Sequence, residues 1–350
     1  MFSTLFHKAT DTLTVAAVAG GIALAATTYA GAQEETITIA SPGAALHFYP
    51  FYVAEAGGFF REEGIKLDWV DVGAGSRQIA AVAGGSAAFA VVGMQPAITA
   101  RQNGADLVAV ASLFNAYPIQ LVLSKAAAEK TGIKPEMSID EKVDRLSGIS
   151  VAVTGIGSTT DVLLRSYLVA RGKKPEEALT IQPLGNPAAM YAAFEQGAID
   201  AFMLGAPHTD QAAASGIGVI VIDPLKGGIP ELQDVPYTGV VTSAGYVRDN
   251  TALVEKVVRA VTRAIKLTAD EPQKAAELTQ TFFKETDPAL FASFEPNYRA
   301  GAAKTPVITE AQYKKLLDWI AITAETQTTV TYGDFVVPTF AEKAAADILK

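Results

Sequence analysis

The sequence contains no cysteine, and only two histidines, His47 and His208, lie after position 32. The lack of cysteine excludes disulfide bonds, metal sites with thiolate ligands and a lipid on an N-terminal cysteine. Two histidines are too few for a metal centre built on imidazoles, so we predict neither a metal nor a cofactor. With no cysteine nucleophile and no usable Ser-His-Asp order, we predict no catalytic residues.

Basic residues are also scarce. Lysine and arginine number 28 against 37 acidic residues, which gives a net charge of −9. Nucleic acids and anionic membranes both favour basic patches, so neither is expected as a partner. Hydrophobic residues make up 49% of the 350 residues, which predicts a globular protein long enough for two domains.

The N-terminal segment 1–32 differs from the rest of the chain. Leu13 to Ala26 is apolar and rich in alanine and glycine, and Ala30-Gly31-Ala32 has the A-x-A pattern of a cleavage site. The run is short for a membrane span, although an N-terminal membrane anchor is the alternative. We predict a signal peptide over 1–32, cleavage after Ala32, and a periplasmic protein.

Short apolar runs alternate with helical patterns over the first two-thirds of the chain, which is typical of α/β layers with largely parallel sheets. The predicted strands are Thr36–Ser41, Lys66–Val72, Ala88–Val92, Leu107–Leu113, Ile119–Leu123, Ile149–Thr154, Leu179–Pro183, Ala198–Leu204, Gly218–Asp223 and Gly239–Ala244. Amphipathic helices are predicted over Asn250–Lys284, with a break at Pro272, and over Ile308–Thr323. We expect these last helices to pack on the first of two α/β lobes.

Two segments of the sequence resemble each other. Ala80–Gly93 and Ala192–Gly205 share a helix end, a glycine turn, an apolar strand and a final glycine, and their numbers differ by 112. Gly73–Ser76 and Gly155–Ser158 are also alike, at an offset of 82. Unless small residues recur here only for steric reasons, the pattern predicts two similar lobes. Their strands would end at one crevice, where ligands bind in open α/β sheets.

The stretch GIGSTTD, Gly155–Asp161, lies between a predicted strand and a predicted helix. Ser158 and Asp161 have the spacing of a capping box, which would satisfy the free amides of the helix. The same amides and hydroxyls can instead bind a polar or anionic ligand. Capping needs Ser158 alone, which would leave the hydroxyls of Thr159 and Thr160 for the ligand.

Four ordered motifs resemble the solute-binding proteins that serve uptake of nitrate, sulfonates, taurine and thiamine-pyrimidine precursors. The first is the run from His47 to Ile65, which is similar to the family pattern P-x-x-x-A-x-x-x-G-x-F-x-x-E-G followed by a hydrophobic residue. The resemblance continues through Gly73–Ala97, Gly155–Asp161 and Ala192–Pro207.

The resemblance implies an α/β type II periplasmic binding protein with two hinge crossovers. Lobe I would comprise 33–118 and 238–350, and lobe II 119–237. Such a protein, expected as a monomer, closes on a small-molecule solute and delivers it to an ABC permease in the inner membrane. The expected solute is a small organic sulfonate or carboxylate, aromatic ones included.

The ligand-binding residues are expected where the motifs meet the crevice. The candidates are Phe48, Tyr49, Ser76, Arg77, Gln95, Asn115, Tyr117, Ser158, Thr159, Thr160, Asn186, Gly205 and His208. For Asn186, capping of the following helix is the favoured reading. Asp161 would repel an anion unless it only completes the capping box, which is the reading we favour, or the solute carries a cationic or donor group.

Two other functions use such a scaffold. One is an enzyme acting on a pyrimidine or chorismate-like substrate, and the other is a sensor that signals to a membrane partner. Fold alone does not choose among them. Tight one-to-one binding without turnover would favour transport, whereas product formation would favour the enzyme.

Overall fold

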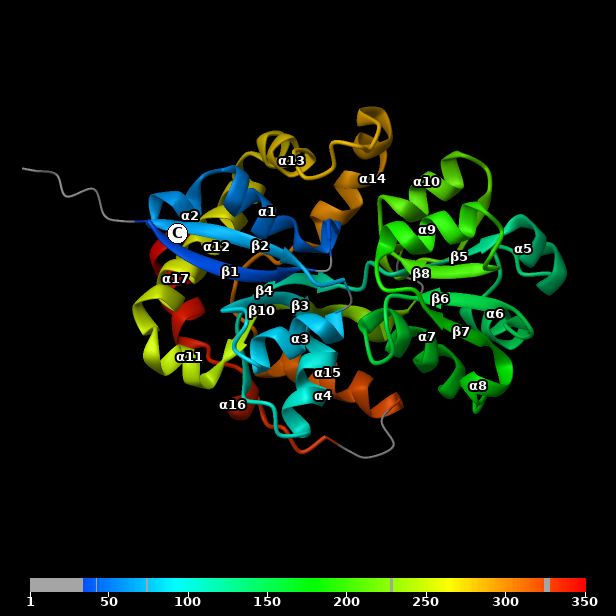
Figure 1. The fold of residues 1–350 in the computed structure, drawn as a ribbon, viewed down its shortest axis with the longest axis horizontal. Helices are drawn as coiled ribbons and strands as arrows, with labels where there is room; N and C mark the ends of the chain where they lie inside the picture. Colours follow the sequence, from blue (N-terminus) through cyan, green and yellow to red (C-terminus); the bar gives the residue numbers. More distant parts are fainter. Residues whose placement is uncertain (1–33, 42, 74, 227–228, 324–327) are drawn as a thin grey trace, which may run out of the picture. The chain divides into compact units, whose positions relative to one another are not determined.

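Ten strands in the described part of the chain form two mixed five-stranded sheets (Figure 1). The computed structural model describes residues 34–350 except positions 42, 74, 227–228 and 324–327, so the predicted signal peptide at 1–32 lies outside the described residues. Every predicted strand is present, with boundaries that shift by a few residues.

The sheet of lobe I has the strand order β2-β1-β3-β10-β4. Its strands are β1 (Glu35–Ser41), β2 (Ile65–Asp71), β3 (Phe89–Gly93), β4 (Leu107–Ala116) and β10 (Gln233–Ser243). The strand β1 pairs in parallel with β2 and β3, whereas β10 runs antiparallel to β3 and β4.

The sheet of lobe II has the order β7-β6-β8-β5-β9. Its strands are β5 (Gln120–Ser124), β6 (Ser150–Val153), β7 (Thr180–Pro183), β8 (Ala201–Leu204) and β9 (Gly218–Ile222). Here β6 pairs in parallel with β7 and β8, and β5 is the reversed strand between β8 and β9.

The two sheets therefore have the same topology, with β3 in the place of β8 and β2 in the place of β7. The repeat at offset 112 matches this equivalence, because it aligns the end of β3 with the end of β8. The repeat at offset 82 is wrong, because it aligns the loop after β2 with the loop after β6. The true counterpart of Gly73 is Gly185, at the same offset of 112, and both glycines have positive φ (79° and 93°).

Helices cover both faces of the lobe I sheet (Figure 1). They are α1 (Tyr49–Ala56), α2 (Phe59–Glu62), α3 (Gly75–Ala83), α4 (Met94–Gln102), α11 (Ala244–Asp249), α12 (Thr251–Asp270), α13 (Pro272–Gln280), α14 (Pro288–Gly301), α15 (Glu310–Thr323), α16 (Tyr332–Phe335) and α17 (Thr339–Ile348). The expected break falls between α12 and α13, where Pro272 starts a new helix. The C-terminal helices pack on lobe I as expected, with α12 against α1 and α17 and α15 against β10.

Lobe II carries its own helices, with α9 and α10 on one face and α6, α7 and α8 on the other (Figure 1). They are α5 (Lys125–Thr131), α6 (Ile139–Arg145), α7 (Thr159–Val169), α8 (Pro175–Ala178), α9 (Pro187–Glu195) and α10 (His208–Ala214). Short 3₁₀ turns lie at Leu46–Phe48, Pro224–Lys226 and Pro230–Leu232.

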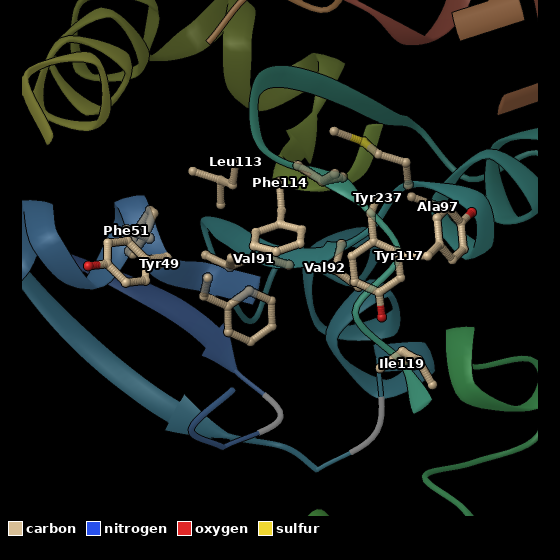
Figure 2. Packing of buried hydrophobic residues seen from close by; sticks show 14 of the residues in the cluster. Tyr49, Phe51, Val91, Val92, Ala97, Leu113, Phe114, Tyr117, Ile119 and Tyr237 are labelled. Carbon is tan, nitrogen blue, oxygen red and sulfur yellow. The ribbon is translucent and has the colours of Figure 1, made fainter. Parts of the chain in front are cut away.

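The chain crosses from the lobe I sheet to the lobe II sheet between β4 and β5, and it returns between β9 and β10. The first crossover is packed by buried aromatic and aliphatic side chains. Tyr117, Tyr237 and Ile119 lie together there in one part of the core (Figure 2).

No helix in the described part of the chain is long and apolar enough to cross a membrane.

Candidate functional site

A cavity of about 70 Å³ lies between the lobes, at the carboxyl ends of strands from both sheets. Lobe I contributes Ala45, His47, Phe48, Gly75, Gln78, Val92, Gly93 and Tyr237. The first crossover and lobe II contribute Ile119, Thr154, Ser158, Thr159, Thr160, Pro187, Leu204 and Gly205. Its position between equivalent strand ends is the one predicted for ligands in open α/β sheets.

Three hydroxyl groups form a closed triangle on the lobe II wall. Thr154 Oγ1 donates to Ser158 Oγ (3.0 Å), and Thr160 Oγ1 lies 2.9 Å from Ser158 Oγ and 3.0 Å from Thr154 Oγ1. Thr160 Oγ1 also accepts a hydrogen bond from the backbone N–H of Thr154 (2.9 Å). The hydroxyl of Thr160 is therefore not spare, which corrects our prediction for that residue.

The predicted capping box is also wrong. Ser158 is the N-cap of α7, but its side chain accepts no bond from the helix, because the hydroxyl triangle occupies its oxygen. Asp161 Oδ2 instead accepts the N–H of Gly157 (2.8 Å), and its Oδ1 accepts from Arg165 Nε (2.8 Å). The carboxylate is thus bound outside the cavity, and Ser158 leaves the first amides of α7 uncapped.

Five of the described α-helices begin at this cavity, and one of them is α1, which Phe48 precedes. Gly75 and Pro187 are the first residues of α3 and α9, Gly93 precedes α4, and Ser158 precedes α7. Helix N-termini carry free N–H groups and partial positive charge, which favours an anionic group between them. No lysine, arginine, aspartate or glutamate is among the described lining residues, so backbone and hydroxyl groups would bind the anion.

His47 and Tyr237 form part of the lobe I wall. Their rings meet edge to face, with centroids 5.2 Å apart. His47 Nδ1 is buried and has no hydrogen-bond partner among the described residues. Burial lowers the pKa of His47 to about 3, so the imidazole is neutral. Burial also raises the pKa of Tyr237 well above its usual range, and a hydrogen bond with Thr159 opposes this.

Gln78 presents a single free polar atom to the cavity. Its Nε2 donates to the carbonyl oxygens of Ala40 and Val91, both at 2.8 Å, which places the side chain between β1 and β3. Both amide hydrogens are used by these bonds, so Oε1 remains as an acceptor. It would suit a ligand that carries a hydrogen-bond donor beside its anionic group.

Tyr298 of α14 fixes the lobe II strand end that lines the cavity. Its hydroxyl accepts a hydrogen bond from the N–H of Ala206 (2.6 Å) and donates to the carbonyl of Pro118 in the first crossover (3.3 Å). A Cβ on the neighbouring Gly205 would lie 3.1 Å from both Pro118 O and Tyr298 Oη. A side chain at this lining position would therefore require Pro118 or Tyr298 to shift by a few tenths of an ångström.

The predicted site residues fall into three groups. Phe48, Ser158, Thr159, Thr160 and Gly205 line the 70 Å³ cavity. Asn186 and His208 line a second cavity of about 550 Å³, and Asn186 also caps α9 by accepting the N–H of Ala189. The remaining six line neither cavity: Tyr49, Ser76, Arg77, Gln95, Asn115 and Tyr117.

Local contacts explain several of these outer positions. Tyr49 is fully buried on α1, and its hydroxyl donates to Glu295 Oε1 of α14 (2.6 Å). Tyr117 packs behind Tyr237, with ring centroids 4.7 Å apart (Figure 2). Arg77 is exposed on α3, and Asn115 accepts a bond from Ser112 (2.6 Å).

The sequence analysis missed five polar or aromatic lining positions or their neighbours: His47, Gln78, Thr154, Tyr237 and Tyr298. His47 is next to the predicted residue Phe48, and Gln78 is next to the predicted residue Arg77. The motifs therefore came within one position of both. Tyr237 and Tyr298 lie far away in the chain, and no local pattern marks them. In the described residues, no group of three or more His, Asp or Glu side chains is placed to hold a metal ion.

The fold and the position of the cavity define a two-lobed periplasmic-binding-protein architecture, as predicted. The alkanesulfonate-binding protein SsuA from Xanthomonas axonopodis pv. citri, solved with bound MOPS, has the same fold. It superposes with a TM-score of 0.66 at 18% identity, over 86% of this chain and 98% of that one.

The chain belongs to the NMT1-like family, which it matches over residues 31–282. It is 22% identical to the putative binding protein YtlA of Bacillus subtilis over 90% of this chain and 92% of that protein. It is 31% identical to a putative aliphatic sulfonates-binding protein of Escherichia coli over 61% of each chain. The predicted relation to solute-binding proteins is thereby confirmed.

Proposed function

We propose that this protein is the periplasmic solute-binding component of an ABC importer, and that it captures a small organic sulfonate or carboxylate between its lobes. The observation that carries the proposal is the cavity at which α3, α4, α7 and α9 begin, lined by hydroxyls and, among the described residues, by no charged side chain. Such a site stabilises an anion by N–H groups and helix dipoles. The sulfonate-binding relatives support the same ligand class.

The site favours binding over catalysis. The unpaired imidazole of His47 is held neutral, and no serine, aspartate or glutamate is paired with it among the described residues. The described lining residues do not assemble the activated nucleophile that an acyl-transfer enzyme requires. In our proposal the mature chain begins at Gln33, acts as a monomer, and closes on its ligand by movement about the two crossovers.

Calorimetry and thermal unfolding of residues 33–350 test this function. Methanesulfonate, butanesulfonate, taurine, propionate, benzoate and nitrate would be titrated separately. We expect one-to-one binding of at least one sulfonate or carboxylate, and at 100 times its Kd a stabilisation of about 2.7 kcal/mol. Mass spectrometry of the recovered ligand should show it unchanged. Conversion of the ligand, or no binding across the whole set, would contradict the proposal.

Cell fractionation and intact-mass measurement test the location. The expected product is a periplasmic chain that starts at Gln33. A membrane-bound chain that retains residues 1–32 would show that this segment is an anchor.

A further inference from the structure

The second cavity, of about 550 Å³, lies directly beside the first. Three chain segments line both. In the first segment, Ala44 lines the second cavity and its neighbour Ala45 lines the first. In the second segment, Pro187 lines both cavities. In the third, Gly205 lines the first cavity and Pro207 lines the second. The two spaces are therefore neighbouring compartments of one cleft between the lobes.

The compartments differ in size in a way that matters for the ligand. Pockets that hold drug-sized molecules measure about 300–1,000 Å³. The first compartment, at about 70 Å³, has room for a compact group only, whereas the second lies within that range. A solute larger than its anionic group needs space outside the first compartment, and the adjoining second compartment offers it.

One wall of the second compartment carries apolar surface that is held in place. The connector between α13 and α14 forms this wall and contributes Phe282 and Phe283, beside the polar residues Thr281, Lys284, Glu285 and Thr286. Phe282 stacks on Tyr52 with ring centroids 4.3 Å apart, and Phe283 is buried against the same ring at 5.8 Å. Pro187 and Pro207 add rigid apolar surface from lobe II.

The polar groups of the second compartment would not attract a second anion. Its described lining residues include two carboxylates, Asp71 and Glu285, and one ammonium group, Lys284, so acidic groups outnumber basic ones. The imidazole of His208 stacks on Tyr191 (5.5 Å), and its Nδ1 lies 3.1 Å from Gln211 Oε1. Because Oε1 is an acceptor, the ring donates from Nδ1, and its other nitrogen is an acceptor in the neutral form.

Resting on the proposed function, we propose that the solute is a long-tailed sulfonate or carboxylate. Its anionic head lies in the first compartment against Ser158, Thr159 and the helix N-termini. Its tail, uncharged or cationic, lies in the second compartment against Phe282 and Phe283. The affinity of the protein therefore depends on tail length as well as on the head.

A homologous series tests the tail. Methane-, butane- and octane-1-sulfonate share one head, and calorimetry on residues 33–350 would give the Kd of each. A buried methylene contributes about 0.8 kcal/mol, so each carbon that enters the second compartment should tighten binding roughly fourfold. We expect octanesulfonate to bind at least a hundredfold more tightly than methanesulfonate.

A matched pair of variants locates the effect. Ala188 and Ala189 are consecutive exposed residues of α9, and of the two Ala188 alone lines the second compartment. Ala188→Trp should fill the compartment and reduce the gain from methane- to octanesulfonate to less than tenfold. Ala189→Trp should retain the full gain.

The outcomes separate the two proposals. Methanesulfonate binding with no gain from chain length overturns the tail compartment and leaves the proposed function standing. An equal gain in Ala188→Trp and in the wild type also overturns it. If no sulfonate or carboxylate binds at all, the proposed function fails, and the inference that rests on it fails too.

Discussion

A Cβ built on Gly93 of lobe I would lie 2.2 Å from Oγ1 of Thr159 in lobe II. Gly93 ends β3 and Thr159 begins α7, so the two lobes meet here, backbone against hydroxyl, at the wall of the cavity. The contact is possible only because position 93 has no side chain.

We therefore expect Gly93→Ala to weaken ligand binding by about tenfold or more. The added methyl would keep the lobes from closing, while each lobe stays folded, so the melting temperature without ligand should change little. Calorimetry with the sulfonate or carboxylate of the titration set that binds the wild type most tightly gives the affinity.

A double-mutant cycle is the control for Gly93. Thr159→Ala removes the oxygen that the methyl would strike, so Gly93→Ala should cost much less in that background. An equal loss in both backgrounds would mean that the methyl acts elsewhere.

Thr160→Val should lower the free energy of unfolding by about 1–3 kcal/mol, because the Thr154 N–H would lose its acceptor inside the protein. Thr159→Val should cost less stability, and it should weaken binding by roughly tenfold or more, because in our proposal the Thr159 hydroxyl, beside Tyr237, binds the anion. Urea unfolding and calorimetry on both variants measure the two effects. The reverse assignment would place the ligand contact at Thr160.

Folding stability should depend on pH through His47. Its pKa is about 3 in the folded protein, and a histidine in the unfolded chain titrates near 6.5. The unfolded state therefore binds the proton first, and stability is lost as the pH falls from about 6.5 towards 3. At pH 5 this loss amounts to about 2 kcal/mol.

Urea unfolding at pH 7 and pH 5 checks this, with His47→Gln as the comparison. Between the two pH values the variant should lose less stability than the wild type, by about 2 kcal/mol. The pKa of His208 is also lowered by burial, and its contribution is common to both proteins. Parallel pH dependence of the two proteins would contradict the assignment to His47.

Tyr298→Phe should reduce both stability and affinity. The variant leaves the Ala206 N–H without its acceptor, which costs about 1–3 kcal/mol, and it loosens the turn that carries Gly205. We expect binding to weaken by about tenfold.

Tyr313→Phe is the matched control for Tyr298. Tyr313 is also buried, and its hydroxyl donates to Val330 O (2.9 Å) within lobe I, far along the chain from the cavity lining. This variant should lose stability but bind ligand normally. If both variants bind normally, Tyr298 has only a structural role.

Local patterns predicted the strands because each is a short apolar run between turn residues. All ten are present, and Pro272 divides two helices as expected. The sequence analysis predicts no helix at 288–301, where the structure has α14 with Pro296 inside it. That omission also hid Tyr298, which reaches the first crossover and the β8 end at once.

The site was only partly predictable for a related reason. The motifs marked the ends of strands near the cavity. At each strand end, any of several neighbouring residues could place its side chain in the cavity lining. Which side chain faces the cavity depends on partners far away in the chain, as Tyr49 shows by bonding to Glu295. The cap at Ser158 failed for a more local reason, since Thr154, just after the end of β6, takes its hydroxyl.

The order of strands has a consequence for biosynthesis. Lobe II forms its sheet from one uninterrupted stretch, Gln120 to Ile222, whereas β10 is inserted between β3 and β4 of lobe I. The lobe I sheet therefore stays split, with two unpaired inner edges, until residues 233–243 have emerged. In a nascent chain the lobe II sheet can therefore be complete before the lobe I sheet, and until then the edges of β3 and β4 that β10 later covers are open to pairing with other chains.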